Sequence, residues 1–414
     1  MPGSFRVSRT AAFWLVTAAL LVLMFAASAP SPLYVVYQAR WHFSAGMLTT
    51  VFAVYAVFLL LALLTLGSLS DYLGRRPVMI GALVVEAVAM LVFAEARSVG
   101  WLLAARAVQG LATGIATGAI AAALVDLEPE SRPGLGALTN GAASTAGLAF
   151  GAFGSGLLVE YGPAPRVTVF AVLLVASLAA AVVLVCIPET VTRRPGAAGS
   201  LLPQVRIPRA SRGPLAAVLP ALVAVWALGG LYLSLAPTLA AGILHVRNHF
   251  VAGLAITTMM SGAVTGSLTM RRRAARPTLV IGSTALAAGA AATLAALGLH
   301  NTALFFAASA VAGYGFGAAF LGALTTIVPT AAPAERAELF AALYVLNYLA
   351  FCVPAVIAGF TVPHAGLLHT AVVYGSVVTA LALISLTVAT TRRPTNGQQR
   401  PTREELPTEA TVGS

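Results

Sequence analysis

The chain has 414 residues, of which 59% are hydrophobic and 9% are charged. Soluble domains carry about 25% charged residues, so this composition argues against an ordinary globular protein and indicates a polytopic membrane protein. The formal net charge is +11, but the arginines fall between apolar runs and form no continuous basic face. This distribution argues against a nucleic-acid partner.

Twelve apolar runs follow one another along the chain, and each is long enough to cross a bilayer core. They cover residues 13–36, 45–66, 78–96, 99–124, 134–160, 166–187, 214–239, 248–270, 277–298, 301–328, 336–360 and 366–389. The pattern predicts an all-α fold with two six-helix pseudo-repeats, residues 1–187 and 214–389. Proline, glycine and arginine predict a cytoplasmic linker over residues 188–213, and the polar residues 390–414 predict a disordered cytoplasmic tail.

The first apolar run can be compared with a secretory leader, because Arg6 and Arg9 precede it and Ala27-Ser28-Ala29 is similar to a cleavage site. However, Pro30 follows directly and the apolar run resumes after it. We therefore expect a first membrane helix with a proline-kinked outer end.

The basic residues predict an orientation. All 24 of them are arginines, and 19 fall on one side if both termini are cytoplasmic. Four fall on the other side, namely Arg40, Arg97, Arg166 and Arg247, while Arg106 lies within the membrane. This asymmetry predicts an inner (plasma) membrane protein with both termini in the cytoplasm.

The charged turn between the second and third runs has the spacing G-x-x-x-D-x-x-G-R-R, formed by Gly67, Asp71, Gly74, Arg75 and Arg76. It resembles the loop 2–3 signature of the major facilitator superfamily of secondary transporters. A weaker version, Gly266-Ser267-Leu268 followed by three arginines, occupies the equivalent position in the second half without the aspartate.

The resemblance implies that this loop is a latch that holds the inner face shut in the outward-open state. Arg75 is then expected to pair with Asp126 at the inner end of the fourth run, and Asp71 to meet the chain near Glu335 and Arg336. The alternative is that these residues are charges that set the topology of a solvated turn.

The fourth run contains Arg106, Gln109 and Gly110, an R-x-x-Q-G spacing that resembles the second motif of the same family. Glu86 is the only acid well inside an apolar run, and the helical rise places it at nearly the depth of Arg106. Glu86 and Arg106 are candidates for proton coupling, because a desolvated acid beside a cation can load and release a proton. A static ion pair and a lipid-facing Glu86 are the alternatives.

Glycines of the fifth run, from Gly147 to Gly156, resemble the antiporter signature of the family. Ala152 stands where that signature has proline, and Ser155 where it has glycine. Close helix packing explains the small residues equally well.

Polar and aromatic residues inside the runs expected to face the centre are candidates for a substrate cavity with few charges, which suits lipophilic compounds. They are Gln109, Asn140, Trp226, Tyr232, Tyr314, Tyr344, Asn347 and Tyr348.

The sequence contains no arrangement of residues that is typical of a catalytic or metal-binding site. The six histidines fall at outer ends or loops, and no metal-ligand spacing, phosphate-binding loop or nucleophile–base pair occurs. We therefore expect no cofactor, no metal and no enzymatic activity, with transport driven by a gradient.

The function that best fits these features is proton-coupled efflux of hydrophobic drugs or secondary metabolites by a monomer in the lipid bilayer. Uptake or efflux of a sugar or another small polar metabolite is the alternative within transport. A non-transporting membrane sensor on the same fold is the alternative outside transport.

Overall fold

The computed structural model describes residues 7–196, 201, 205–332 and 335–391. Within these ranges, twelve spans are long and apolar enough to cross a membrane. The spans are α1 (Arg9–Ser28) with α2 (Pro30–Trp41), α3 (Ala45–Leu66), α5 (Arg75–Ala94), α6 (Val99–Asp126), α7 (Leu135–Tyr161), α8 (Pro165–Leu184), α9 (Arg212–Gly242), α10 (His249–Met270), α11 (Ala275–Gly298), α12 (Thr302–Ile327), α13 (Arg336–Ala365) and α14 (Leu367–Thr391). The predicted all-α fold with twelve membrane spans is confirmed. The predicted tail lies outside the described residues from position 392 onward.

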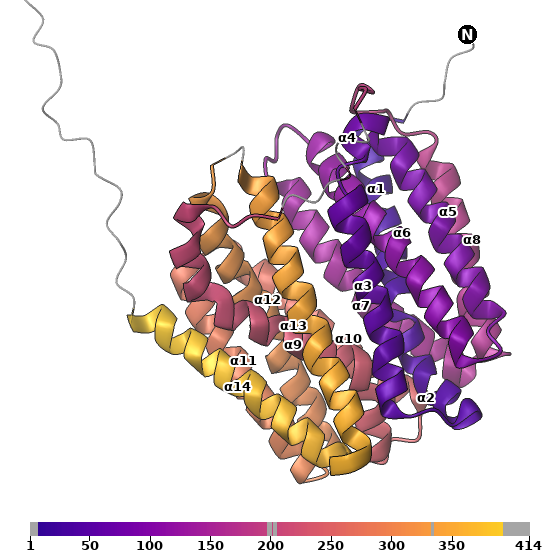
Figure 1. The fold of residues 1–414 in the computed structure, drawn as a ribbon, viewed down its shortest axis with the longest axis vertical. Helices are drawn as coiled ribbons and strands as arrows, with labels where there is room; N and C mark the ends of the chain where they lie inside the picture. Colours follow the sequence, from indigo (N-terminus) through magenta and orange to yellow (C-terminus); the bar gives the residue numbers. More distant parts are fainter. Residues whose placement is uncertain (1–6, 197–200, 202–204, 333–334, 392–414) are drawn as a thin grey trace, which may run out of the picture.

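The spans form two bundles that lie side by side, α1–α8 and α9–α14 (Figure 1). The short helix α4 (Ser70–Leu73) lies at the top of this view and α2 at the bottom. We call these two ends of the molecule the α4 end and the α2 end. The antiparallel order of the spans places the start of α9 and of α13 toward the α4 end.

The first span is interrupted where the sequence predicts a kink. Proline has no backbone N–H, so Pro30 leaves the carbonyl of Ala26 without its helical partner. α1 ends at Ser28 and α2 begins at Pro30, with Ala29 between them in helical conformation. A freed carbonyl within a membrane needs a donor from a neighbouring helix, and this need shapes the site described below.

Short polar residues begin four of the spans, because a side-chain oxygen can accept from the unpaired N–H groups of the first turn. Ser8 accepts from Ala11 at 3.2 Å and Ser44 from Met47 at 3.2 Å. Asn248 and Asn301 accept in the same way at the starts of α10 and α12.

The described contacts between the halves extend from the α2 end to the middle of the bundle. At the α2 end, Gly46 of α3 lies against the ring of Phe360 in α13, where a Cβ would come within 2.9 Å of the ring. Nearer the middle, the rings of Phe52 and Phe351 have centroids 4.8 Å apart. The halves are therefore packed closely on this side.

Candidate functional site

A charged cluster at the α4 end contains the predicted latch residues. Arg75 donates to Ser70 at 2.7 Å and also bonds Asp71. Its Nε lies 3.4 Å from Oδ2 of Asp126, so the predicted contact between Arg75 and Asp126 is present. Thr190 donates to the same oxygen of Asp126 at 2.8 Å.

Glu189 is a member of this cluster that the sequence reasoning missed. Its two carboxylate oxygens accept from the backbone N–H of Arg75 at 2.8 Å and of Arg76 at 3.1 Å. A carboxylate at this position caps the start of α5 and complements the helix dipole. A signal was present in the sequence, because Glu189 is the only acid between residues 188 and 213.

Gly74 explains why the turn requires glycine. Its φ is +102°, and a Cβ at this position would lie 2.6 Å from a carboxylate oxygen of Glu189. Any other residue would strain the backbone and displace the cap. Gly67 follows the last residue of α3 at the start of this turn and has a helical conformation.

The described bonds of the predicted latch residues stay within the N-terminal half in this conformation. Asp71 is half exposed and its described bond goes to Arg75. Arg76 donates to the carbonyls of Val185 and Ile187 beyond α8. The expected contact of Asp71 near Glu335 and Arg336 is not among the described interactions.

A second, buried polar cluster lies inside the N-terminal half. The guanidinium of Arg106 is 4.5 Å from the centroid of the Tyr55 ring, and its side chain is 1% exposed. Arg106 donates to the carbonyl of Ala27 at 3.1 Å and to Oε1 of Gln109 at 2.6 Å. The guanidinium is therefore contacted by the face of the Tyr55 ring, by the side-chain amide of Gln109 and by the carbonyl of Ala27 near the break in the first span.

Gln109 connects Arg106 to Glu86. Its Nε2 donates to Glu86 Oε1 at 3.0 Å and to the carbonyl of Ala26 at 2.9 Å. That carbonyl is the one left free by Pro30, so the glutamine satisfies the helix break as well as the carboxylate. Glu86 and Arg106 do not form a direct ion pair; the glutamine amide stands between them.

Glu86 is fully buried, and this excludes the lipid-facing alternative. Two polar atoms of the cluster, Glu86 Oε2 and Arg106 Nε, have no hydrogen-bond partner. Gly110 allows α6 to approach α3 closely, because a Cβ there would lie 2.9 Å from the backbone nitrogen of Leu59. The R-x-x-Q-G motif thus brings two polar side chains into the centre of the half.

An aromatic cluster faces this polar cluster from the C-terminal half. Trp226 of α9 lies 5.5 Å from Tyr348, 5.9 Å from Phe351 and 5.8 Å from Phe320 between ring centroids. Tyr344 stacks on Tyr348 at 6.5 Å. Phe351 in turn contacts Phe52, and Phe52 lies 5.9 Å from the guanidinium of Arg106. Aromatic contacts therefore run from the C-terminal half to Arg106.

Three of the aromatic and amide candidates thus come together with three aromatic residues that the sequence reasoning missed, Phe52, Phe320 and Phe351. Asn347 lies on the same helix as Tyr344 and Tyr348 and is buried, with its Oδ1 unpartnered. The Nε1 of Trp226 is also buried without a partner. The helical spacing of Tyr344, Tyr348 and Phe351 was a signal that could have found the cluster.

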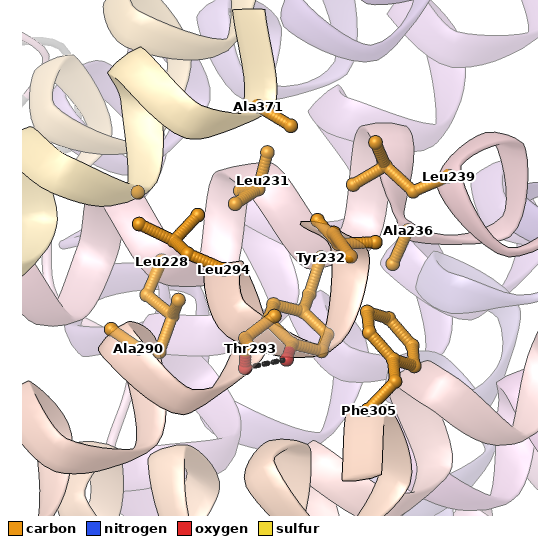
Figure 2. Close-up of a pocket in the computed structure, with 12 residues that line it drawn as sticks. Leu228, Leu231, Tyr232, Ala236, Leu239, Ala290, Thr293, Leu294, Phe305 and Ala371 are labelled. Atoms are coloured by element: carbon orange, nitrogen blue, oxygen red, sulfur yellow. Dashed lines mark hydrogen bonds between the residues drawn. The ribbon is translucent and has the colours of Figure 1, made fainter. Parts of the chain in front are cut away.

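Tyr232, another predicted cavity residue, lies away from the aromatic cluster. Its hydroxyl bonds Ser309 at 2.8 Å and Thr293 at 3.3 Å. Figure 2 shows the bond to Thr293. With leucines and Phe305 it surrounds a cavity of only about 10 Å³ between α9, α11, α12 and α14. Tyr232 therefore packs inside the C-terminal half, because it projects from a different face of α9 than Trp226 does.

Two further candidates are separate from the aromatic cluster in the described contacts. Tyr314 bonds Thr269 of α10 through its hydroxyl at 3.1 Å. Asn140 is half-buried in α7, where its carbonyl accepts from Ser144.

The small residues of α7 pack against both halves. Gly147 lies against Met24 and Leu21 of α1, and a Cβ on Gly156 would come within 3.3 Å of Phe250 in α10. Ser155 donates to the carbonyl of Ala29 at the helix break. This segment therefore joins the first span to the C-terminal half.

Comparisons with solved structures show the same fold at low sequence identity. The xylose transporter XylE from E. coli superposes with a TM-score of 0.71 and 14% identity, covering 93% of this chain and 98% of that one. A D-xylose-proton symporter gives 0.72 and 16%, with 91% and 97% covered. A bacterial homologue of the human lysosomal transporter Spinster gives 0.71 and 11%, with 93% and 97% covered.

A comparison with curated protein sequences finds no significant match. The model of the Major Facilitator Superfamily, however, matches residues 16–353, which is most of the chain. The fold, the charged turn and this match agree. The chain belongs to the Major Facilitator Superfamily and is a membrane transporter, not an enzyme.

Proposed function

We propose that the protein is a proton-coupled exporter of hydrophobic compounds that works by alternating access. The observation that carries the proposal is the contact between two clusters. The buried Glu86–Gln109–Arg106 cluster of the N-terminal half adjoins the aromatic cluster of the C-terminal half through Phe52 and Phe351.

The described contacts fit a state that is closed at the α2 end and open at the α4 end. Bonds and ring contacts between the halves run from the α2 end to the middle, and the described bonds of Asp71, Arg75 and Arg76 stay within one half. A latch between the halves is expected to form only when the α4 end closes. The described bond of Asp71 to Arg75, within the N-terminal half, is consistent with that cycle.

The arginine asymmetry supports placing the α4 end in the cytoplasm of a cell with an energised inner membrane. With that orientation, the state described here opens toward the cytoplasm, from which an exporter takes its substrate. Protons entering from outside would drive the return step.

The substrate class follows from the surfaces that meet at the centre. Six aromatic rings meet there, Phe52 from the N-terminal half and five from the C-terminal half, namely Trp226, Phe320, Tyr344, Tyr348 and Phe351. Aromatic side chains offer large apolar surfaces, with polar tips only on tyrosine and tryptophan. Such a surface favours planar or lipophilic compounds.

The coupling step is assigned to Glu86. A carboxylate buried without a cationic partner is costly, and binding a proton removes the charge. Glu86 Oε2 is unpartnered and Oε1 accepts a single bond, from Gln109. Because Gln109 also accepts from Arg106, protonation of Glu86 would alter the position of the cation next to Tyr55 and Phe52.

A second candidate function is transport of a sugar or another small polar metabolite. It is favoured by the buried and unpartnered polar atoms Trp226 Nε1, Asn347 Oδ1 and Tyr34 Oη, which could bond substrate hydroxyls. The structural neighbours named as xylose transporters have the same fold.

Growth and transport measurements distinguish the two functions. The chain is expressed in a strain that lacks its main exporters, and growth is measured on a panel of hydrophobic toxic compounds, with Asp71→Asn as the inactive control. In parallel, purified protein in proteoliposomes is offered labelled pentoses and hexoses. Protection by the wild type alone supports export, while sugar flux without any protection would replace the first function by the second.

A further inference from the structure

At the α2 end, an acid and a histidine join the two halves. Oε2 of Glu160, at the end of α7, lies 2.9 Å from Nδ1 of His249 and accepts from its backbone N–H at 2.9 Å. His249 is the first residue of α10, so the carboxylate also meets the positive end of that helix. One side chain of the N-terminal half thus binds the C-terminal half at two points.

The neighbouring contacts reinforce this junction. Nδ2 of Asn248 donates to the hydroxyl of Tyr161 at 3.2 Å. The ring of Phe250 packs edge-on against Phe153 and lies 6.3 Å from the ring of Tyr161. Opening the α2 end would have to break all of these contacts together.

Water and protons can reach the junction. The side chains of His249 and Glu160 are 37% and 24% exposed. A pocket of about 340 Å³ adjoins His249, lined also by Pro32 and Val35 of α2 and by His245 and Arg247 of the preceding loop. The histidine can therefore exchange its proton with the solution on this side.

The titratable and charged groups around His249 are Glu160 and Tyr161 from α7 and His245 and Arg247 from its own loop. The residues of α2 at the pocket carry no charge. Arg247 opposes a positive charge on His249, but its side chain is exposed and therefore screened. The nearest charge is the carboxylate of Glu160.

We propose that His249 is a proton-binding site that holds the α2 end closed through Glu160, so that acid on this side stabilises the state open at the α4 end. A carboxylate only accepts hydrogen bonds, so Nδ1 must carry a hydrogen in either charge state. Imidazole gains its second proton within the physiological pH range, and the contact then becomes an ion pair. Neutral His249 keeps the hydrogen bond but loses the attraction between charges.

This inference rests on the alternating access of the proposed function, but it requires neither the substrate nor Glu86. The distance between the halves is therefore the suitable readout. Spin labels are placed on Val167→Cys in α8 and Leu299→Cys after α11, both exposed at the α2 end. Cys186 and Cys352 are first replaced by alanine, and the labelled protein is studied in nanodiscs by double electron–electron resonance without substrate.

In the wild-type background, the ratio of open to closed populations at the α2 end should rise about two- to fivefold between pH 5.5 and pH 8, the range expected for a partly exposed ion pair. His249→Asn keeps a hydrogen-bond donor but cannot titrate, so its ratio should be constant. Glu160→Gln should remove the pH dependence independently. His245→Asn is the matched control, since it lines the same pocket without bonding Glu160, and it should behave as the wild type.

A pH shift that persists in both His249→Asn and Glu160→Gln would overturn the proposal, and so would a wild-type ratio that does not change with pH. Neither result bears on substrate transport, which the growth and proteoliposome assays measure separately. Conversely, a protein that shows the pH-dependent opening but exports nothing would leave this inference intact and contradict the proposed function.

Discussion

Gln109 donates a hydrogen bond to Glu86 at 3.0 Å while its other amide atom accepts from Arg106 at 2.6 Å. The amide therefore joins the acid and the cation without direct contact between them. Arg106 lies beside Tyr55 and Phe52, where the two halves meet. This connection leads to the first two predictions.

Glu86→Gln should abolish uphill transport driven by a pH gradient, because the variant carries no exchangeable proton at this position. Downhill exchange of substrate should persist, since the aromatic cluster is unchanged. The measurement is flux into proteoliposomes with and without an imposed gradient. Glu95→Gln, at the exposed end of the same helix, is the control. Undiminished uphill transport in Glu86→Gln would remove Glu86 as the carrier.

Gln109→Leu should lower the free energy of unfolding by about 2 kcal/mol, because it leaves a buried carboxylate and a buried guanidinium each with one partner fewer. Thermal unfolding in detergent measures the loss. Gln38→Leu makes the same chemical change on α2, where the side chain has no described hydrogen bond, and should have a much smaller effect. Equal effects of the two substitutions would show that the bridge does not stabilise the fold.

Asp71→Asn should leave expression near the wild-type level while most transport is lost. The residue bonds Arg75 at an exposed turn, so folding tolerates the change, but the state closed at the α4 end loses its latch. Charge reversal at both Arg75 and Asp126 should recover part of the transport lost in either single reversal. A double variant that is no better than the singles would show that this pair is not coupled in function.

Glu189→Gln should destabilise the start of α5 by about 1 kcal/mol, because one amide oxygen replaces two charged acceptors at the helix N-terminus. Hydrogen exchange of the Arg75 and Arg76 amides should become faster in this variant. Glu130→Gln, in the exposed turn before α7, should leave this exchange unchanged. Protection that is the same in both variants would contradict the capping role.

Reporter fusions test the orientation. Fusions after Arg194 and after Arg273 should both report a cytoplasmic location, and a fusion after Asn248 should report an external one. The reason is the excess of arginine on the side that carries the α4 turn. An external signal after Arg194 would invert the proposed orientation and with it the proposed direction of transport.

The sequence by itself determined the membrane fold. Apolar runs of about 20 residues have no alternative to helices in a bilayer, since each backbone group must be satisfied within its own segment. The family can be recognised from the charged turn between Gly67 and Arg76, which is also a local feature of the sequence. Gly74 is required there by the backbone conformation of the turn itself. The contact of Arg75 with Asp126 was also predicted, because both residues lie at neighbouring ends of successive helices.

Only the tertiary structure decided which side chains meet in the interior. The depth of a residue in the membrane can be counted along its helix, and this count places Glu86 and Arg106 at nearly the same depth. Whether Gln109 lies between them depends on how α5, α6 and the broken first span are rotated about their axes. Rotation also separates Trp226, in the aromatic cluster, from Tyr232, which packs within the C-terminal half. The sequence of a nearly uniform apolar helix does not show which face packs against other helices and which faces lipid, because both environments are apolar. The bonds of Glu189 to α5 and of Glu160 to His249 join residues 89 to 114 positions apart, and only the packing of whole helices brings them together.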